Sequence, residues 1–389
     1  MSNKITCNGI YTAANGTSSH KGVKNKIDAQ INAFGSFGIK FNYVEFDQPF
    51  KEGTLMKLWR RIPFTSSYKT GTVLSAVKTK DCIYMRYFLG DNGFLHFLKK
   101  IKAINPSIYI VVEFFDWPYD FYHSSFKDRI LLAKDKLIRN ELKKYVNLSV
   151  NFAGATTTFG IPSISTFNGI EFNSIPVSAY SGESIEIKII AVSTMQNYHG
   201  FDRLIKGLGI FYREKRNMSI KLYLIGKGPQ KENYIKLADT YGISNRIVFT
   251  GELYGKELDN AFTNADIAVS SLGLHREGVV TSPLKFAESV ARGLPVIIAD
   301  GNTRIETKTD YIFNVPSNDD AIDIEWLIFS YESLSEKYGS KSDLHQYIRT
   351  DAEKHYSSME AMRNIASNIL LHKSDMPYNL NKKAGQKSL

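Results

Sequence analysis

Short apolar runs alternate with amphipathic stretches through the second half of the chain. The apolar runs are rich in β-branched residues and predict strands at 185–192, 220–225, 246–250, 265–270 and 295–299. The stretches between them carry apolar residues three and four positions apart and predict helices at 200–213, 230–241, 256–264 and 283–292. Strands that alternate with helices over short connections predict a parallel sheet with right-handed crossovers.

The first half shows the same alternation. Strands are expected at 4–11, 40–46, 81–87 and 107–113, and helices at 23–34 and 93–104. Residues 172–183 are rich in Ser, Pro and Gly and suggest a linker. Two further helices are expected at 323–336 and 343–371, whereas residues 374–389 lose all periodicity and suggest a mobile tail.

These elements predict an α/β protein of two Rossmann-like, doubly wound domains. The first is expected over residues 1–175, the second, with the C-terminal helices, over 176–371, and a flexible tail over 372–389. Such sheets bind ligands beyond the carboxyl ends of their strands, so we expect a ligand cleft between two facing domains. The fold alone does not establish a function, which has to come from the site.

The composition is that of a globular chain. With 389 residues, of which 43% are hydrophobic and 13% aromatic, the chain can build two cores. Cys7 and Cys82 show neither a disulfide framework nor a metal-ligand spacing and are expected to be buried thiols in a reducing compartment. The start of the chain is too polar for a signal peptide, and no apolar run reaches the ~18 residues of a membrane span. A cytoplasmic protein, peripheral at most to the inner face of the cell membrane, is expected.

The net charge of +10 lies in the first half of the chain. Residues 1–172 contain 23 Lys and Arg against 13 Asp and Glu, whereas residues 173–389 contain 26 of each. A basic half favours an anionic partner, such as an anionic membrane or a phosphate-bearing acceptor, although lysine-rich surfaces also serve solubility alone. No nucleic-acid recognition motif appears, so nucleic acid is not expected as a partner.

The most informative chemistry surrounds the predicted helix at 283–292. Ser282 is expected to cap this helix, with Pro283 at the first helical position, where its missing N–H costs nothing. The free backbone amides of residues 278–284, Thr281 and Ser282 among them, lie at the positive end of the helix dipole. This arrangement predicts an anion-binding site.

Lys285 and Glu288 lie on the same face of that helix. A lysine in the first turn opposes the helix dipole by a few tenths of a kcal/mol, so an anionic ligand explains Lys285 better than helix stability does. Glu288 is suited to accept two hydrogen bonds from a ribose diol. Phosphate and ribose on one helix indicate a nucleotide. The alternative is an ordinary Lys–Glu pair on an exposed helix face.

The second half resembles the donor domain of the GT-B retaining glycosyltransferases, and glycosyltransferase family 4 in particular. The matching segments are K-I-I-A-V and H-G-F-D-R-L-I-K-G-L (within 188–208), L-Y-L-I-G-K-G-P (222–229), I-V-F-T-G-E-L (247–253), A-D-I-A-V-S-S (265–271) and E-S-V-A-R-G-L-P-V-I (288–297). They keep the order and spacing of the family. The first half resembles it more weakly, through Gly22, Arg86, E-F-F-D-W-P-Y (113–119), and F-G-I-P-S-I and F-N-G-I within 159–170.

The resemblance implies a nucleotide-sugar on the second domain, an acceptor on the first, and transfer that retains the anomeric configuration without a metal. No Asp-x-Asp ends a strand, so no metal site is expected, and no cofactor apart from the donor substrate, taken to be UDP-linked. In the family, the carboxylate matching Glu288 holds the ribose, and the residues matching Glu252 and Leu253 border the base. The residues expected to line the donor are His199, Gly200, Gly226, Lys227, Glu252, Leu253, Thr281, Ser282, Lys285 and Glu288.

Two departures from the family pattern bear on this site. Members usually carry an Arg and a Lys that clamp the diphosphate after the first strand of the domain, where this chain has Thr194 and His199. Members also usually have two Glu separated by seven residues; the first falls here on Val280, with Glu277 near but out of register. We expect Lys285 to take over part of the diphosphate neutralisation, with a further hydrogen bond from His199.

The first half offers three polar candidates at the carboxyl ends of predicted strands. Arg86, Glu113 and Asp116 are expected to face the cleft and to orient the acceptor, although Asp116 also fits a turn. Gly22 is expected in a loop before a helix, where glycine lets the backbone approach the donor phosphate. Residues 50–64 mix apolar and basic side chains and suggest either a membrane-interface segment or a loop packed on the core.

The sequence thus predicts a retaining, metal-independent glycosyltransferase that moves a hexose from a UDP-sugar to a lipid-linked or saccharide acceptor in surface or capsular polysaccharide synthesis. The catalytic candidates are Lys285, Glu288, Arg86, Glu113 and Asp116. Two alternatives stay open. One is a catalytically degenerate partner protein that binds nucleotide or lipid for another transferase. The other is a sugar-nucleotide 2-epimerase, which needs a cluster of acid–base carboxylates and histidines that the sequence does not display.

Overall fold

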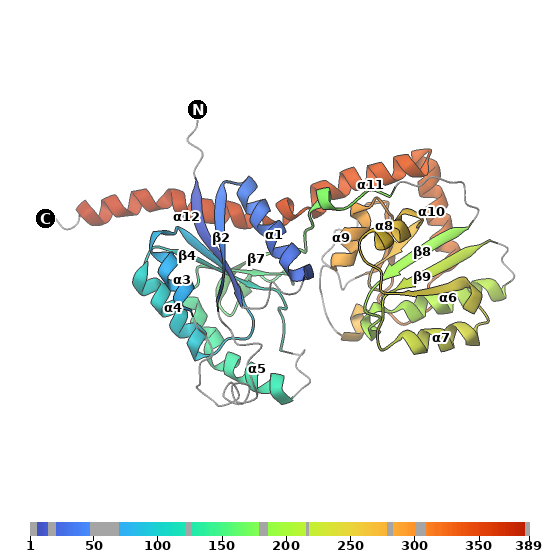
Figure 1. The fold of residues 1–389 in the computed structure, drawn as a ribbon, viewed down its shortest axis with the longest axis horizontal. Coiled ribbons are helices and arrows are strands. Elements are labelled where there is room, and N and C mark those ends of the chain that lie inside the picture. Colours follow the sequence, from blue (N-terminus) through green and yellow to red (C-terminus); the bar gives the residue numbers. More distant parts are fainter. Residues whose placement is uncertain are drawn as a thin grey trace. The chain divides into compact units, whose positions relative to one another are not determined.

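The computed structural model describes residues 6–14, 21–46, 70–120, 126–178, 186–214, 218–277, 283–300 and 309–385. The chain forms two compact units, one of Met1–Thr166 with Ser358–Leu389 and one of Phe167–Ser357. Each unit is built on one β-sheet with helices packed against it (Figure 1). The prediction of two Rossmann-like α/β sheets is confirmed.

The sheet of the first unit has the strand order β2-β1-β3-β4-β5-β7-β6. Its strands are β1 (Cys7–Ala14), β2 (Ile39–Phe46), β3 (Cys82–Arg86), β4 (Tyr109–Phe114), β5 (Leu148–Asn151), β6 (Thr157–Thr158) and β7 (Ile161–Ser165). Neighbours pair in parallel, except that β6 pairs antiparallel with β7 at one edge. Strands β3 and β4 are buried along their whole length, which explains why both consist mainly of apolar residues.

The helices of the first unit are α1 (Lys21–Ser36), α3 (Gly71–Ala76), α4 (Asn92–Ile104), α5 (Phe126–Ile138) and α12 (Ser358–Gly385). Helix α4 shows how the sequence sets a helix start. The carboxylate of Asp91 accepts hydrogen bonds from the backbone N–H groups of Gly93 and Phe94, at 2.7 and 3.3 Å. Apolar residues three and four positions apart then form the buried face, namely Phe94, Phe97, Leu98 and Ile101.

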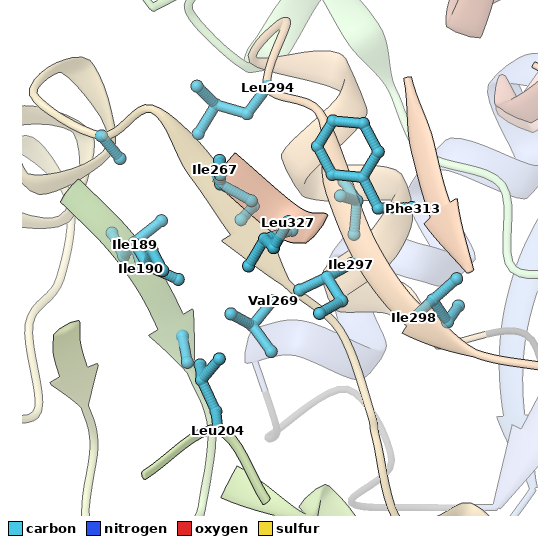
Figure 2. Close-up of a cluster of buried hydrophobic side chains, with 14 of the residues drawn as sticks. Ile189, Ile190, Leu204, Ile267, Val269, Leu294, Ile297, Ile298, Phe313 and Leu327 are labelled. Carbon is cyan, nitrogen blue, oxygen red and sulfur yellow. The ribbon is translucent and has the colours of Figure 1, made fainter. Parts of the chain in front are cut away.

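The sheet of the second unit has the order β10-β9-β8-β11-β12-β13, and all its pairs are parallel. Its strands are β8 (Ile187–Val192), β9 (Ile220–Ile225), β10 (Ile247–Gly251), β11 (Ile267–Val269), β12 (Val296–Ala299) and β13 (Ile312–Val315). Its helices are α6 (Phe201–Arg213), α7 (Lys231–Thr240), α8 (Lys256–Thr263), α9 (Leu284–Ala291), α10 (Ile324–Tyr338) and α11 (Lys341–Tyr356). The core brings Leu204 and Leu327 from two helices together with Ile189 and Val269 from the strands (Figure 2).

The C-terminal helices differ from the prediction. The single helix expected at 343–371 is two helices, because Ser357 adopts an extended backbone with φ −70° and ψ 154°. Helix α12 belongs to the first unit, where the Thr166 hydroxyl donates a hydrogen bond to the carbonyl of Ala361 at 2.6 Å. The same helix continues to Gly385, through most of the stretch where a mobile tail was expected.

The boundary between the units also differs from the predicted linker at 172–183. The units divide between Thr166 and Phe167. Ser178 is packed on the second unit, since its N–H donates to the carbonyl of Arg292 and its hydroxyl to that of Phe262, at 2.8 and 3.1 Å. These hydrogen bonds could not be foreseen from composition. The rest of the expected linker, from residue 179 on, lies outside the described residues.

The remaining sequence predictions concern the cysteines and the membrane. Cys7 and Cys82 are buried and free, as expected, with their Sγ atoms 3.6 Å apart. Among the described residues no helix is long and apolar enough to cross a membrane. The basic, apolar segment at 50–64 lies outside the described part of the chain.

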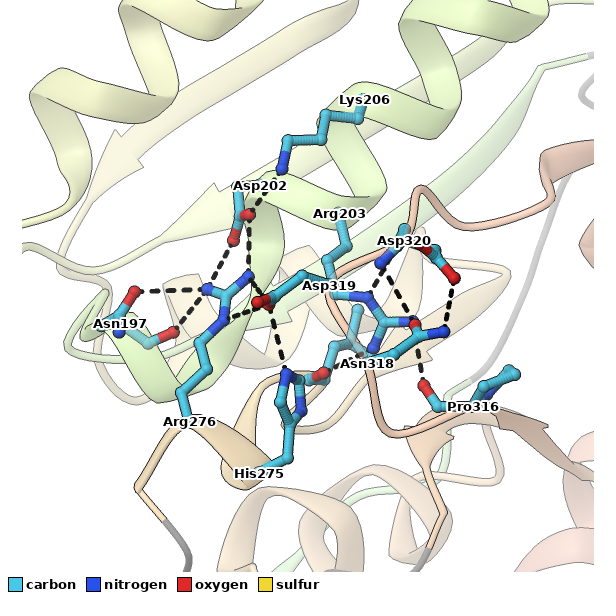
Figure 3. A network of polar contacts seen from close by, with 11 residues as sticks. Asn197, Asp202, Arg203, Lys206, His275, Arg276, Pro316, Asn318, Asp319 and Asp320 are labelled. Atoms are coloured by element: carbon cyan, nitrogen blue, oxygen red, sulfur yellow. Dashed lines mark hydrogen bonds and ion pairs between the residues drawn. The ribbon is translucent and has the colours of Figure 1, made fainter.

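Arg203, in the first turn of α6, ties together loops of the second unit (Figure 3). Its side chain is 1% exposed. The guanidinium donates to four oxygens at 2.6–3.0 Å, namely the carbonyls of Leu272, Pro316 and Asp320 and the side chain of Asn318. Removal of a buried charge from such a set leaves several buried acceptors without donors, which makes the contact costly to lose.

We therefore expect Arg203→Met to lower the stability of the second unit by about 3 kcal/mol. In calorimetry this corresponds to a fall of roughly 6–12 °C in the unfolding temperature for a unit of this size. Arg213→Met is the matched control, because Arg213 lies exposed at the end of the same helix. Equal unfolding temperatures for the two variants would contradict this role of Arg203.

Candidate functional site

The strand order of the second sheet reverses between β8 and β11. From β8 the sheet continues through β9 to β10 on one side, and from β11 it continues through β12 to β13 on the other. The loops that leave two such strands diverge, and the crevice between them at the carboxyl edge is the usual ligand site of a doubly wound sheet. The residues predicted to hold the donor follow β8, β9, β10 and β11, and therefore belong to this edge.

The loops after β8 and β9 are in direct backbone contact. The N–H of Gln230 donates to the carbonyl of Met195 at 3.1 Å. An added Cβ would lie 1.9 Å from the carbonyl oxygen of Ser193 at Gly226, and 1.7 Å from that of Thr194 at Gly228. Both glycines also have positive φ, 124° and 157°. The G-K-G-P sequence is therefore needed for this close approach, which shapes the edge.

His199 is held in place by its own backbone. It ends the short 3₁₀ turn Asn197–His199, whose carbonyls at Tyr198 and His199 accept hydrogen bonds from the N–H groups of Gly273 and Leu272, at 3.2 and 2.9 Å. Gly200 follows with φ 66°, and an added Cβ there would lie 2.7 Å from the nitrogen of Gly273. Gly200 thus allows the loops after β8 and β11 to touch at the point where the strand order reverses.

The hydrogen bonds of His199 determine which ring nitrogen carries the proton. Its Nδ1 accepts from the backbone N–H of Gln196 at 3.0 Å. Burial, together with the positive charge of Lys285, lowers the pKa of His199 to about 3. The ring is therefore neutral near pH 7 with its proton on Nε2, which makes Nε2 a hydrogen-bond donor to a ligand.

Lys285 stands in the first turn of α9. The helix begins at Leu284, one residue later than predicted, and its capping residue is Pro283, with φ −64° and ψ 128°, in place of the predicted Ser282. The Nζ of Lys285 is shielded from solvent and makes no hydrogen bond to the described residues. Burial lowers the pKa of Lys285 to about 7, against the opposing effect of Glu288. A buried ammonium without a partner indicates a place for an anion.

Glu288 lies one turn further along α9 and forms no ion pair with Lys285 in the described part of the chain. Burial raises the pKa of Glu288, although the charges of Arg292 and Lys285 oppose this shift. Arg292 itself is engaged elsewhere, by Asp259 at 2.8 Å and by the ring of Phe262 at 4.2 Å. The alternative of an exposed Lys–Glu surface pair therefore does not fit the structure.

Lys227 and Glu252 extend from the loops after β9 and β10. Their side chains form an ion pair of 2.6 Å and are 75% and 36% exposed. The two loops also meet through the N–H of Gly226, which donates to the carbonyl of Gly251 at 2.7 Å. Leu253 follows and packs partly buried against the core of the unit. Four of the predicted donor residues, Gly226 included, thus lie on these two neighbouring loops.

Two residues of this edge were not singled out in the sequence. Met195 is fully buried with a positive φ of 43°, a strained conformation for a side chain of this size. Arg276 donates to the carboxylates of Asp202 and Asp319 and to the carbonyl of Asn197, which anchors the turn that carries His199 (Figure 3). Neither role has a signature in sequence, since both depend on loops that meet only in the fold.

Some predicted residues lie outside the described part of the chain, and Gly22 lies elsewhere than expected. Thr281, Ser282 and Val280 lie outside the described residues, and Glu277 is exposed at the end of the described segment before them. Gly22 was expected in a loop, but it is the second residue of α1, and an added Cβ there would meet nothing within 4 Å. The structure therefore gives no steric reason for a glycine at this position.

In the first unit the structure joins two of the three predicted polar residues. Arg86, the last residue of β3, lies in register with Glu113, the penultimate residue of β4, and their Nε and Oε1 atoms are 3.3 Å apart. Asp116 is exposed two residues beyond the end of β4. Within the described residues no group of three or more His, Cys, Asp or Glu side chains could hold a metal ion.

Comparison with known proteins identifies the second unit by sequence. Residues 182–349 match the family model described as glycosyl transferases group 1. This range contains all of the residues that were expected to line the donor, except Gly22. No curated protein matches the chain in sequence.

Solved structures match nearly the whole chain in fold. A glycosyltransferase from Rickettsia africae ESF-5 has a TM-score of 0.61 at 14% identity, over 94% of this chain and 99% of that one. Anabaena Alr3699/HepE, solved with UDP, has a TM-score of 0.57 at 12% identity, over 93% and 99%. An alpha-glucosyltransferase solved with UDP and a 13-mer DNA has a TM-score of 0.59 at 13% identity, over 94% and 100%. Residues 182–349 are therefore a glycosyl transferases group 1 domain, and the chain as a whole has two parallel α/β sheets, as in the GT-B glycosyltransferases of known structure.

Proposed function

We propose that this chain transfers a hexose, with retention and without a metal ion, from a UDP-sugar to a lipid-linked or saccharide acceptor. The observation that carries the proposal is the shielded, unpartnered Nζ of Lys285, close enough to the neutral His199 to affect its pKa, on the segments that follow the two strands where the sheet order reverses. An ammonium and an N–H donor at this point suit the diphosphate of a nucleotide-sugar.

The same pair suits the chemistry of transfer. Negative charge develops on the diphosphate as the bond to the sugar breaks, and preorganised donors stabilise that charge most strongly in a site without water. Lys285 supplies a full positive charge when protonated, and His199 supplies a fixed N–H. These two residues take the place of the Arg and Lys that the family resemblance leads one to expect at Thr194 and His199.

The remaining donor contacts follow from the positions of their residues. Glu288 is free of ion pairs with Lys285 and is proposed to accept hydrogen bonds from the ribose hydroxyls. Leu253, Glu252 and Lys227 lie on the two outer loops and are proposed to border the base. The amides around Thr281 and Ser282 are proposed to reach the phosphates.

Two lines of similarity support the choice of UDP and of a saccharide acceptor. Anabaena Alr3699/HepE was solved with UDP and with UDP and glucose, and the alpha-glucosyltransferase with UDP. The lipopolysaccharide outer core galactosyltransferase WaaB has a TM-score of 0.55 to this chain at 11% identity. With the basic first half, these likenesses favour an anionic acceptor in surface or capsular polysaccharide synthesis.

The proposal predicts release of UDP from at least one UDP-sugar in a panel that also contains GDP- and dTDP-sugars. Acceptor arms should include a lipid-linked diphosphate sugar, an oligosaccharide and a DNA duplex, each with and without EDTA. Lys285→Met should weaken UDP binding by roughly tenfold or more. It should also lower kcat by about a hundredfold, since it removes a donor to the leaving group.

Lys256→Met is the matched control, because Lys256 is an exposed lysine at the start of another helix of the same unit, α8. Its kinetics should equal those of the unmodified protein. Tight UDP binding without turnover of any donor would favour a partner protein over an enzyme. Interconversion of UDP-sugars without transfer would favour an epimerase, and a Lys285→Met variant with unchanged kinetics would remove Lys285 from the site.

A second prediction concerns pH. The pKa of Lys285 is about 7 in the free protein, and a bound diphosphate should raise it, because a nearby anion favours the protonated amine. Above pH 7 binding then requires uptake of a proton. The affinity for UDP should therefore fall as the pH rises from 7.5 to 9, by at most about tenfold per pH unit.

Titration calorimetry in buffers of different ionisation enthalpy measures both the affinity and the proton uptake. Lys285→Arg should bind UDP with no such pH dependence, because a guanidinium stays protonated throughout this range. A slope for the unmodified protein that persists in Lys285→Arg would assign the titration to another group.

A further inference from the structure

A buried ionic cluster lies beneath α1 at the carboxyl edge of the first sheet. Arg86 ends β3 and Glu113 lies beside it on β4, with side chains 7% and 0% exposed. Lys26 of α1 approaches the same carboxylate oxygen, Oε1, at 3.9 Å and is 15% exposed. Two cations therefore share one buried carboxylate.

The other oxygen of Glu113 is already engaged. Its Oε2 accepts hydrogen bonds from the hydroxyl of Tyr84 at 2.6 Å and from the side-chain amide of Gln30 at 3.0 Å. Burial alone would raise the pKa of Glu113, but the charges of Lys26 and Arg86 and these hydrogen bonds lower it below its ordinary value. Glu113 is thus an ionised carboxylate that holds the cluster in place.

The guanidinium of Arg86 is not satisfied by this carboxylate. Its Nε and Nη1 are buried and make no hydrogen bond to the described residues, since the ion pair with Glu113 lacks hydrogen-bond geometry. One face of the guanidinium lies on the ring of Phe115, and its Cζ is 4.7 Å from the centre of that ring. A buried arginine with donors left over is rare and calls for an acceptor.

Lys26, like Arg86, lies against an aromatic ring. Its Nζ lies 4.4 Å from the centre of the Phe152 ring. Burial lowers the pKa of Lys26 to about 8, against the effect of Glu113, so the amine is mainly protonated at pH 7. Asp116 also acts on both cations, but its side chain is exposed to solvent, where its charge is screened.

The position of the cluster fits a binding site. The first sheet reverses its strand order between β1 and β3, and Arg86 stands at the carboxyl end of β3. This is the place where doubly wound sheets bind ligands. An ion cluster that served the core alone would be expected to satisfy its donors, as Arg203 does in the second unit with four acceptors.

We propose that Arg86 and Lys26 form an anion subsite of the first unit, positioned by Glu113, that binds an acidic group of the acceptor, either a phosphate or a carboxylate. Binding of an anion here requires only the residues of this cluster, whereas the assignment of that anion to the acceptor rests on the proposed function. The subsite therefore restricts the acceptor to a phosphorylated or uronate-bearing one, and the basic charge of the first half would attract such an acceptor.

The test measures binding of inorganic phosphate and of glucuronate to the full chain at pH 7 and constant ionic strength, by 31P or 13C line broadening. Lys285→Met serves as the background, so that anion binding at the proposed donor site is weakened and is the same in all variants compared. One of the two anions should bind with a Kd in the millimolar range, and Lys26→Gln and Arg86→Gln should each weaken it about tenfold or more. The anion that responds tells whether the acidic group is a phosphate or a carboxylate.

Lys24→Gln is the matched control. Lys24 lies on the same helix and carries the same charge, but it is 54% exposed and pairs with Asp28 at 2.6 Å. Its removal should leave the affinity unchanged within twofold. If Arg86→Gln does not fold, Lys26→Gln decides alone. Equal affinities of Lys26→Gln and Lys24→Gln for both anions would overturn the proposal.

The outcome is independent of the donor experiment. Loss of phosphate or glucuronate binding in the cluster variants would support the subsite even if no UDP-sugar were turned over. Normal UDP binding together with equal anion affinities in all variants would leave the proposed function intact and remove only the subsite.

Discussion

Each sheet of this protein reverses its strand order once, and the placement of the functional groups follows from that constraint. In the second unit the reversal lies between β8 and β11, and in the first between β1 and β3. Loops that leave neighbouring strands in opposite directions cannot cover the carboxyl edge between them. His199 lies in the loop after β8 and Lys285 in the helix that follows β11, on the two sides of one reversal, and Arg86 ends a strand at the other.

The buried cations of the chain fall into two kinds. Arg203 is fully buried and donates to four oxygens, and it connects the loops of the second unit as a structural contact. Lys285 and Arg86 are also buried, but they keep nitrogen atoms without hydrogen-bond acceptors among the described residues. Such groups cost stability unless a ligand satisfies them. The contrast within one molecule separates a cation whose donors are satisfied inside the core from the two cations that are proposed to bind anions.

The sequence correctly predicted most of the features that depend on residues close together in the chain. The strands and helices between 185 and 299 occur in the predicted order, because period and β-branched content reflect which faces are buried. Lys285 was singled out because a cation in the first turn of a helix is unfavourable without an anion, and its role at the donor site stays a prediction. Local rules failed at Pro283, which caps α9 instead of beginning it, and at Gly22, which lies inside α1. Both errors concern the first residues of a helix, the part of a helix that a periodic pattern locates least well.

By itself, the sequence determined the class of fold, the helix that carries Lys285 and Glu288, and the glycines of the loop after β9. Each of these depends on neighbours within a few residues. Only the tertiary structure decided that His199 is neutral with its proton on Nε2, and that α12 joins the first unit. It also decided that Arg86 and Lys26 share the carboxylate of Glu113. Protonation states and partners depend on burial and on groups from distant segments, which no local pattern encodes.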